Sequence, residues 1–154
     1  MRVERVAARA TFPLRQRVLR PHQTVDDLAQ SGDDDPDSGH FAAIDAAGEI
    51  VGTASVYREP PPWSPGATEA WRLRGMATAE GRRSQGIGGD VLAAVIAHVG
   101  SAGGGVLWCN ARVPAVTFYR RAGFVTRGQP WDEPAIGPHV AMYRTVDAIP
   151  DAAG

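Results

Sequence analysis

The clearest pattern in the sequence is a run of apolar residues at helical spacing in its second half. Each of these residues lies three or four positions from another one, so that together they fall on one face of a helix. They are Ile87, Val91, Leu92, Val95, Ile96 and Val99. The pattern predicts a helix over residues 87–101, and the glycines at 103–105 are expected to end it.

Short apolar and β-branched runs elsewhere predict strands, while Gly, Pro and Asp mark the connections. Strands are expected at residues 2–8, 40–45, 50–57, 71–77, 106–109, 124–126 and 140–146, and irregular loops at 33–39, 59–70 and 128–139. Thr11 is expected to cap a first helix, which Pro21 ends. Pro114 is expected to open a last helix, which ends at Gly123. This order of elements predicts an α+β fold.

A glycine-rich turn joins the strand at 71–77 to the long helix. Residues 83–88 read Arg-Ser-Gln-Gly-Ile-Gly. The first backbone N–H groups of a helix have no partner within the helix and lie at the positive end of its dipole, so they attract anions. Gly86 and Gly88 carry no Cβ atom that would keep a phosphate away from the backbone. The turn therefore predicts a site for a phosphate-bearing ligand.

Three classes of ligand use such a turn, and the sequence distinguishes them. The P-loop of nucleoside triphosphate enzymes needs a lysine, and the chain contains none. The dinucleotide motif G-x-G-x-x-G, counted from Gly86, needs a glycine where Val91 stands, and an acidic residue about 20 residues further on. Near that position the chain has Trp108, Cys109 and Asn110 instead. The third class is the diphosphate of coenzyme A. The spacing R-x-x-G-x-G resembles the acetyl-CoA motif of the GNAT superfamily of N-acetyltransferases.

A second motif downstream strengthens this resemblance. Residues 118–124, Phe-Tyr-Arg-Arg-Ala-Gly-Phe, resemble the F/L-Y-x-x-x-G-F signature of the same family. Ala115 lies four residues before Tyr119, as the family pattern N-x-x-A-x-x-x-Y requires, but Arg112 occupies the position of its Asn. The nearest asparagine is Asn110. With both motifs in order, the chain is identified as a member of the GNAT superfamily, and its segments 14–21 and 136–142 resemble the ElaA-like branch.

The resemblance implies a single-domain GNAT fold over residues 1–146, followed by a disordered tail at 147–154. It implies a mixed, mostly antiparallel sheet of six to seven strands, flanked by about four helices. The strands at 71–77 and 105–110 are expected to splay apart and to admit acetyl-CoA, the implied cosubstrate, with no metal. The implied cofactor contacts are Met76, Ala77, Thr78, Arg83, Ser84, Gln85, Gly86, Ile87, Gly88, Asn110, Phe118 and Tyr119.

Transfer of an acetyl group to an amine needs a donor for the thioester oxygen and a proton for the leaving thiolate. A backbone N–H near Met76 is expected to face that oxygen. The resemblance implies that Tyr119 is the general acid, and a core aromatic with a satisfied hydroxyl is the alternative interpretation. Direct transfer is expected, because Cys109 falls on a predicted buried strand with no adjacent His to activate it.

The attacking amine must also lose a proton, because a free alkylamine with a pKa near ~10 is mostly protonated at pH 7. Glu69 and His139 are the candidate bases, and Asp132 and Glu133 lie in the same late loop as His139. A histidine can move protons near neutral pH. A structural histidine bonded to the backbone is the alternative at position 139.

Composition narrows the setting of this chemistry. The chain has 154 residues and a formal net charge of −1, which gives no broad attraction to nucleic acid. Its single cysteine cannot form an internal disulfide, and no Cys/His cluster suggests a metal site. No apolar segment predicts a secretory signal or a membrane span, so we expect a cytoplasmic protein without a membrane partner.

Two alternatives to an N-acetyltransferase stay open from the sequence. One is a non-catalytic acyl-CoA-binding or regulatory module with the same fold, although its tyrosine motif is intact. The other is a toxin-like enzyme acting on charged tRNA, which the lack of a basic bias disfavours. The sequence does not identify the acceptor amine, a small molecule or a peptide, and leaves the choice between monomer and homodimer open.

Overall fold

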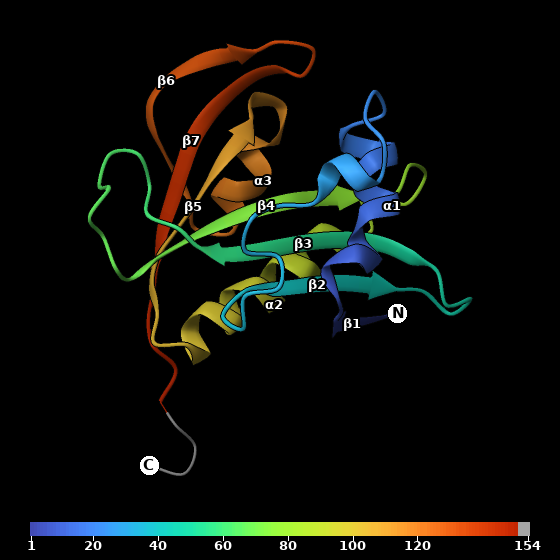
Figure 1. Ribbon diagram of the computed structural model, residues 1–154, viewed down its shortest axis with the longest axis horizontal. Helices are drawn as coiled ribbons and strands as arrows, with labels where there is room; N and C mark the ends of the chain where they lie inside the picture. Colours follow the sequence, from blue (N-terminus) through green and yellow to red (C-terminus); the bar gives the residue numbers. More distant parts are fainter. Residues whose placement is uncertain (151–154) are drawn as a thin grey trace. The chain divides into compact units, whose positions relative to one another are not determined.

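The computed structural model describes residues 1–150, which form seven strands, three α-helices and two short 3-10 helices (Figure 1). In chain order these are β1 (Arg2–Arg5), α1 (Ala8–Leu19), η1 (Asp26–Leu28), β2 (Gly39–Ile44), β3 (Ile50–Arg58), β4 (Ala70–Thr78), α2 (Ile87–Ser101), β5 (Gly105–Arg112), η2 (Val113–Ala115), α3 (Val116–Arg121), β6 (Val125–Glu133) and β7 (Gly137–Val146). The strand order is β1-β2-β3-β4-β5-β7-β6, and the β4–β5 pair is parallel. The predicted mixed sheet is confirmed, with three α-helices rather than four.

The chain divides into two compact units, which are described separately. The first contains residues 1–58 and 73–98, and the second contains residues 59–72 and 99–150. The strand β4 and the helix α2 each contribute residues to both units.

An antiparallel hairpin, β2–β3, forms the centre of the first unit. The two strands pair from Gly39 opposite Val56 to Ile44 opposite Ile50, and β1 pairs with the other edge of β2. Asp45 closes the turn between them, because its Oδ1 accepts the N–H groups of Ala47 and Glu49, both at 3.0 Å. The strands predicted at 40–45 and 50–57 are confirmed.

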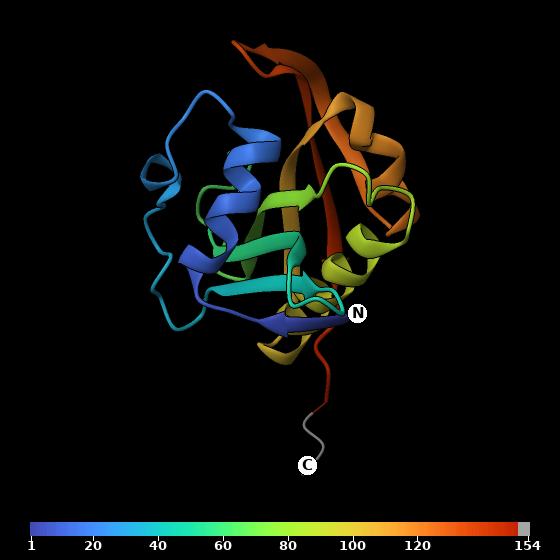
Figure 2. The same ribbon diagram turned by 90° about the vertical axis from the view of Figure 1, so that its right-hand side faces the viewer.

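The helices α1 and α2 lie on opposite faces of this hairpin (Figure 2). Helix α2 packs closely on β3 because Gly52 has no side chain: a Cβ atom there would stand 2.5 Å from Cγ2 of Ile87. Val91 and Val95 of α2 are completely buried, as the helical pattern predicted. On the other face, Phe12 of α1 is 1% exposed and packs with Ala8 and Leu28.

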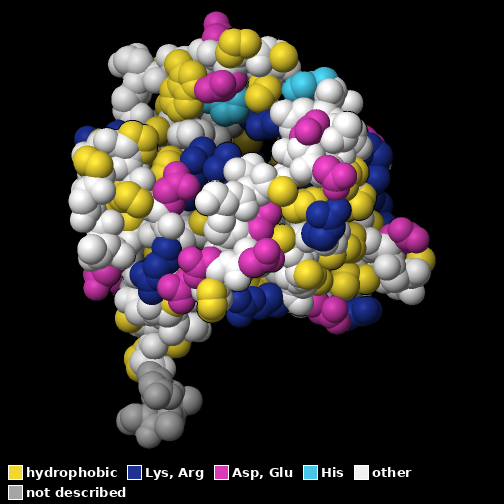
Figure 3. Space-filling view, in the orientation of Figure 1, with side chains coloured by type: hydrophobic (Ala, Val, Ile, Leu, Met, Phe, Trp, Pro, Cys, Tyr) yellow, Lys and Arg dark blue, Asp and Glu magenta, His cyan; other side chains and the backbone are white. Residues whose placement is uncertain are grey.

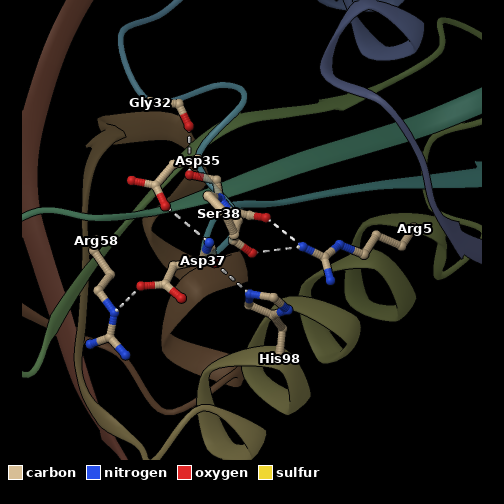
Figure 4. Close-up of polar contacts among 8 residues, drawn as sticks. Arg5, Gly32, Asp35, Asp37, Ser38, Arg58 and His98 are labelled. Carbon is tan, nitrogen blue, oxygen red and sulfur yellow. Dashed lines mark hydrogen bonds and ion pairs between the residues drawn. The ribbon is translucent and has the colours of Figure 1, made fainter.

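The acidic loop before β2, which was predicted as irregular, is tied to the rest of the first unit (Figure 4). Arg5 Nη2 donates to the backbone oxygen of Ser38 at 2.7 Å. His98 Nε2 lies 2.9 Å from the backbone oxygen of Asp37, whose carboxylate forms a 3.0 Å ion pair with Arg58. The loop is therefore exposed but fixed, by contacts that only the folded chain brings together.

The second unit is built on an antiparallel sheet of β5, β7 and β6. Strand β7 pairs with β5 from Val146 opposite Gly105 to His139 opposite Arg112. Only the first three residues of β4 pair with β5, in register from Ala70 opposite Val106 to Arg72 opposite Trp108. Among the described residues, no further β4–β5 pair is formed, so the pairing ends well before either strand does.

The prediction of an irregular loop at residues 128–139 is wrong. Strand β6 continues to Glu133 and β7 already begins at Gly137, so the segment is mostly a hairpin. The loop was predicted because the segment contains prolines, and a proline removes a hydrogen-bond donor from a sheet. Here β6 is an edge strand, and its pairing is irregular between Arg127 and Trp131, where Pro130 is tolerated.

Two helix starts also differ from the prediction. Helix α1 begins at Ala8, and Thr11 lies inside it, buried, with its Oγ1 donating to the Ala8 oxygen at 2.7 Å. The last helix begins as the 3-10 turn η2, with Pro114 near its start, and becomes α-helical only at Val116. The tail was predicted at 147–154: residues 147–150 have no regular secondary structure, and residues 151–154 lie outside the described residues.

Candidate active site

The turn before α2 presents the first N–H groups of that helix. The first hydrogen bond of the helix runs from Asp90 N–H to the Gly86 oxygen at 3.1 Å. The N–H groups from Gly86 to Gly89 therefore have no acceptor within the helix. Gly86 has a φ of +79° and Ser84 a φ of +67°, a backbone conformation that turns the chain sharply into α2. The predicted glycine-rich turn is thus present at the start of α2, and anion binding there stays a prediction.

Side chains of the first unit hold this turn in place. Arg82 Nε donates to Gln85 Oε1 and Arg82 Nη1 to Asp45 Oδ2, both at 3.0 Å. The predicted contact residue Gln85 is thus engaged by Arg82, while its neighbours Arg83 and Ser84 are exposed. Arg82 thus anchors the turn to the β2–β3 hairpin through Asp45.

The end of β4 leads into the turn and carries a break in its regular geometry. Gly75 has a φ of +66°, and its oxygen accepts a hydrogen bond from Thr53 Oγ1 at 2.9 Å. Met76, Ala77 and Thr78 follow, beyond the point where pairing with β5 ends. The three residues predicted to meet the pantetheine arm therefore lie between a fixed glycine and the helix start.

Tyr119 belongs to the second unit and lies on α3. Its side chain is 6% exposed, and its ring makes edge contacts with Phe118 and Phe124 at centroid distances of 5.1 and 5.5 Å. Burial raises the pKa of Tyr119 well above its usual value, and Cys109 raises it further, while the Arg112 guanidinium lowers it. The phenol is therefore neutral, and it carries a proton that it can donate.

Arg112 takes the place of the family asparagine at the end of β5. Burial lowers the pKa of its guanidinium, and Tyr119 raises it. Asn110, the predicted contact nearby, is exposed on the same strand, opposite Ala141. Cys109 is 2% exposed, and burial raises the pKa of its thiol to about 12, so it is no nucleophile at neutral pH.

His139 is buried at the start of β7, beside Arg112 in the sheet register. Its Nδ1 lies 2.9 Å from the Gly137 oxygen, so a neutral ring that donates there leaves Nε2 as the acceptor. Trp131 stacks on the ring at 6.0 Å and donates its Nε1–H to Glu133 Oε1 at 2.8 Å.

Glu69, the other candidate base, lies just before β4. It is exposed, and its backbone oxygen accepts the N–H of Val106 at 2.9 Å. It therefore stands at the start of the parallel β4–β5 pair, with all of β4 between it and Thr78.

A cavity in the first unit was not predicted as such. Its volume is about 250 Å³, and its lining includes Arg15, Arg20, Asp27, Gln30, Arg74 and Gly75. Arg15 and Gly75 were not among the candidate site residues from the sequence. One signal was available for Arg15: it lies three residues after Phe12 and four before Leu19, on the apolar side of α1.

Within residues 1–150, no three His, Cys, Asp or Glu side chains lie together as a metal site. Over the same range, no helix is both long and apolar enough to cross a membrane. Basic and acidic side chains are interspersed on the face shown in Figure 3.

Comparison with known proteins agrees with this arrangement. The model of the acetyltransferase (GNAT) family matches residues 6–124. An uncharacterized N-acetyltransferase of Bacillus subtilis strain 168, YitI, is 33% identical over 146 residues, which cover 95% of this chain and 97% of YitI. The fold and the sequence thus define an acetyltransferase of the GNAT type.

Solved structures resemble the fold along nearly its whole length. ElaA of Escherichia coli has a TM-score of 0.74 at 16% identity, with 93% of this chain and 98% of ElaA covered. An aminoglycoside 6'-N-acetyltransferase complexed with coenzyme A has a TM-score of 0.68 at 16% identity, covering 98% of this chain and all of that one. The chain belongs to the GNAT family of acetyltransferases. Its place in the ElaA-like branch stays a prediction.

Proposed function

We propose that the protein transfers an acetyl group from acetyl-CoA directly to a primary amine of a small molecule or peptide. The observation that carries this proposal is the start of α2, where a glycine-rich turn leaves a row of backbone N–H groups without helical acceptors. The resemblance to a structure complexed with coenzyme A supports the choice of cosubstrate.

The residues of the turn fit a diphosphate. A Cβ atom at Gly86 or at Gly89 would meet no atom of the described residues within 4 Å beyond their own stretch of backbone. The Cβ positions of these two glycines therefore face open space. The helix dipole favours negative charge at the N–H groups of this helix start. Arg83, exposed beside them, adds a positive charge.

Bound acetyl-CoA would supply the thioester that the amine attacks and the thiol that leaves. The backbone of Met76, Ala77 and Thr78 would bind its amide-containing arm much as a neighbouring strand does. The Met76 N–H would donate to the thioester oxygen as negative charge develops on it. Asn110 and Phe118 stay the further cosubstrate contacts that the family resemblance implies.

Tyr119 would donate its proton toward the sulfur of the departing thiol. The phenol is suited to this because burial keeps it protonated at neutral pH, while the charge of Arg112 opposes that shift and favours release of the proton. His139 would accept the proton of the amine through Nε2, since its Nδ1 is directed to the Gly137 oxygen. Glu69, at the far end of β4, is the second candidate for that role.

The test combines cosubstrate binding with turnover. Thermal unfolding is measured with and without acetyl-CoA, since a ligand at ~100 times its Kd stabilises the folded state by about 2.7 kcal/mol. Thiol release is then followed across a panel of primary amines for the wild type and for Tyr119→Phe. We expect the Tyr119→Phe variant to bind acetyl-CoA normally and to lose about 100-fold in kcat, since a general acid contributes at least about that much.

Each outcome of this test has a clear meaning. An unchanged kcat in Tyr119→Phe would show that Tyr119 is a core aromatic rather than the acid. Stabilisation by acetyl-CoA without turnover of any amine would favour a non-catalytic acyl-CoA-binding module. No stabilisation by acetyl-CoA would refute the proposal itself.

A further inference from the structure

The cavity of the first unit lies against the part of β4 that leads to the proposed acetyl site. Its lining includes Gly75, which immediately precedes Met76, the proposed donor to the thioester oxygen. At about 250 Å³ it is smaller than the pockets of about 300–1,000 Å³ that bind drug-sized ligands. A small polar molecule is the occupant that fits.

Polar side chains fill the sheet face beneath α1, and most of them are paired. His40 Nδ1 lies 2.8 Å from Ser55 Oγ, and Tyr57 donates its hydroxyl to Asp33 Oδ1 at 2.6 Å. Thr53 donates to the Gly75 oxygen at 2.9 Å. Buried polar groups are expected to be satisfied in this way.

Arg15 is the exception on this face. Its side chain lines the cavity and is only 5% exposed, yet its Nε has no hydrogen-bond partner within the described residues. Its Nη1 reaches Thr11 Oγ1 at 3.5 Å, which is too long for a strong bond. Over residues 1–150, no carboxylate forms an ion pair with it. A buried cation without an anion is costly, so the site favours a ligand that supplies one.

The backbone of β4 makes room for this guanidinium. A Cβ atom on Gly75 would stand 2.5 Å from Arg15 Nε, and the φ of +66° at Gly75 suits glycine. The guanidinium thus lies directly against the strand, at the residue before the proposed reaction centre. An anion bound to Arg15 would be held at a fixed position relative to Met76.

We propose that Arg15 binds the carboxylate of the acceptor, so that the substrates are small aminocarboxylates. This inference rests on the proposed acetyl transfer and adds the class of acceptor to it. A planar carboxylate matches the fork of a guanidinium. The lining includes three arginines and one aspartate, Asp27, which suits a molecule carrying one carboxylate and an amine better than a phosphate dianion.

The test compares each acceptor with its uncharged counterpart. Thiol release from acetyl-CoA is measured with the proteinogenic amino acids, β-alanine and 4-aminobutyrate, each beside its carboxamide, which keeps the amine but removes the negative charge. We expect the wild type to prefer at least one carboxylate over its carboxamide by about 10- to 100-fold in kcat/KM, the range expected for a hydrogen bond to a charged group. Arg15→Met should abolish this preference mainly through KM.

Arg17→Met is the matched control, because it removes a charge from an exposed position on the same helix. It should retain the preference. Arg15→Lys keeps the positive charge without the fork, and it should recover part of the preference. Thermal unfolding of all three variants would be measured to check that they are folded.

A binding readout separates this inference from the proposed transfer. In the protein without acetyl-CoA, the Nε–H resonance of Arg15 should shift on titration with the preferred amino acids and not with their carboxamides. Equal rates for carboxylate and carboxamide, a preference that survives in Arg15→Met, or an unmoved Arg15 resonance would each overturn the inference. Turnover of amines that lack a carboxylate would leave the acetyl transfer standing, whereas failure to bind acetyl-CoA would refute that transfer alone.

Discussion

Arg112 stands where the family pattern has an asparagine, and its charge acts on the proposed acid. The pKa of Tyr119 is raised chiefly by burial, and the guanidinium of Arg112 lowers it. A phenol whose pKa is too high transfers its proton less readily, because efficient acids have a pKa near the working pH. Arg112 therefore tunes Tyr119 in this account, a role that the asparagine of the pattern could not play by charge.

Replacing Arg112 by glutamine tests this role. Arg112→Gln removes the charge, so the pKa of Tyr119 should rise further, and kcat should fall by about 3- to 30-fold. Initial rates over a range of acceptor and acetyl-CoA concentrations separate kcat from KM. A rise in KM at constant kcat would instead mean that Arg112 binds a substrate and does not act through Tyr119.

At the scale of the element, the proposed diphosphate site gives a reason for the three glycines at positions 86, 88 and 89, at the start of α2. An ordinary helix start tolerates an acidic residue, and the helix dipole even favours one. A binding site for a diphosphate must instead leave the same amides open. The open space at the Cβ positions of Gly86 and Gly89 fits the proposed binding of a diphosphate, whereas helix stability alone would favour other residues there.

Gly89→Glu tests helix stability and coenzyme A binding separately. The side chain fits without a clash, and both the loss of a helical glycine and the negative charge at the helix start should stabilise the protein, together by about 1 kcal/mol. The same charge should weaken coenzyme A binding at least about 10-fold by repulsion, since each 1.4 kcal/mol changes Kd by that factor. Urea unfolding and calorimetric titration measure the two effects.

Gly89→Gln is the neutral control for this variant. It should gain the helix propensity and lose much less affinity for coenzyme A. If Gly89→Glu bound coenzyme A as tightly as the wild type, the diphosphate could not lie at this helix start.

Pattern within one element predicted some parts of the structure well and others poorly. The bounds of α2 were predicted from apolar spacing and from the glycines that follow it, because both signals lie within or next to the helix itself. The hairpin of β6 and β7 was missed because Pro130 disfavours a central strand, and only the sheet order shows that β6 is at an edge. The first helix was begun too late because Thr11 was interpreted as a cap, while its hydroxyl bonds back to Ala8 within the helix.

Some residues of the candidate site were likewise predicted from the sequence, and others were not. The glycine-rich turn at 83–88 and Tyr119 were predicted from motifs, since the residues of each motif are close in sequence. The Arg15 cavity was not, because it depends on α1 lying over β4 and on a single glycine, Gly75, that leaves space for the guanidinium. Contacts between distant segments of this kind are set by tertiary packing, which neither helical spacing nor the family motifs describe.

At the scale of the whole molecule, buried hydroxyls make stability fall at high pH. Burial raises the pKa of Tyr57 from 10.0 to about 12, with a further contribution from its hydrogen bond to Asp33. Burial also raises the pKa of Tyr119. Each group keeps its proton longer in the folded state than in the unfolded chain, so the unfolded chain binds fewer protons in that range.

The sign of the effect follows from this difference. Below about pH 9 these tyrosines are protonated in both states, so they should not make the free energy of unfolding depend on pH. The free energy of unfolding should decrease as pH rises from about 10 toward 12 and beyond. Tyr119→Phe should reduce the steepness of the decrease. Urea unfolding at a series of pH values measures it, and a stability that rises above pH 10 would contradict the burial of these groups.

The central claim is that the amides at the start of α2 bind the diphosphate of coenzyme A. The most direct measurement is an amide NMR titration of the protein with coenzyme A and, separately, with pantetheine, which lacks the diphosphate. The account predicts that coenzyme A shifts the amide resonances of Gly86, Ile87, Gly88 and Gly89 strongly and that pantetheine leaves them nearly unchanged. Coenzyme A binding that leaves these four resonances in place, or equal shifts with pantetheine, would contradict it.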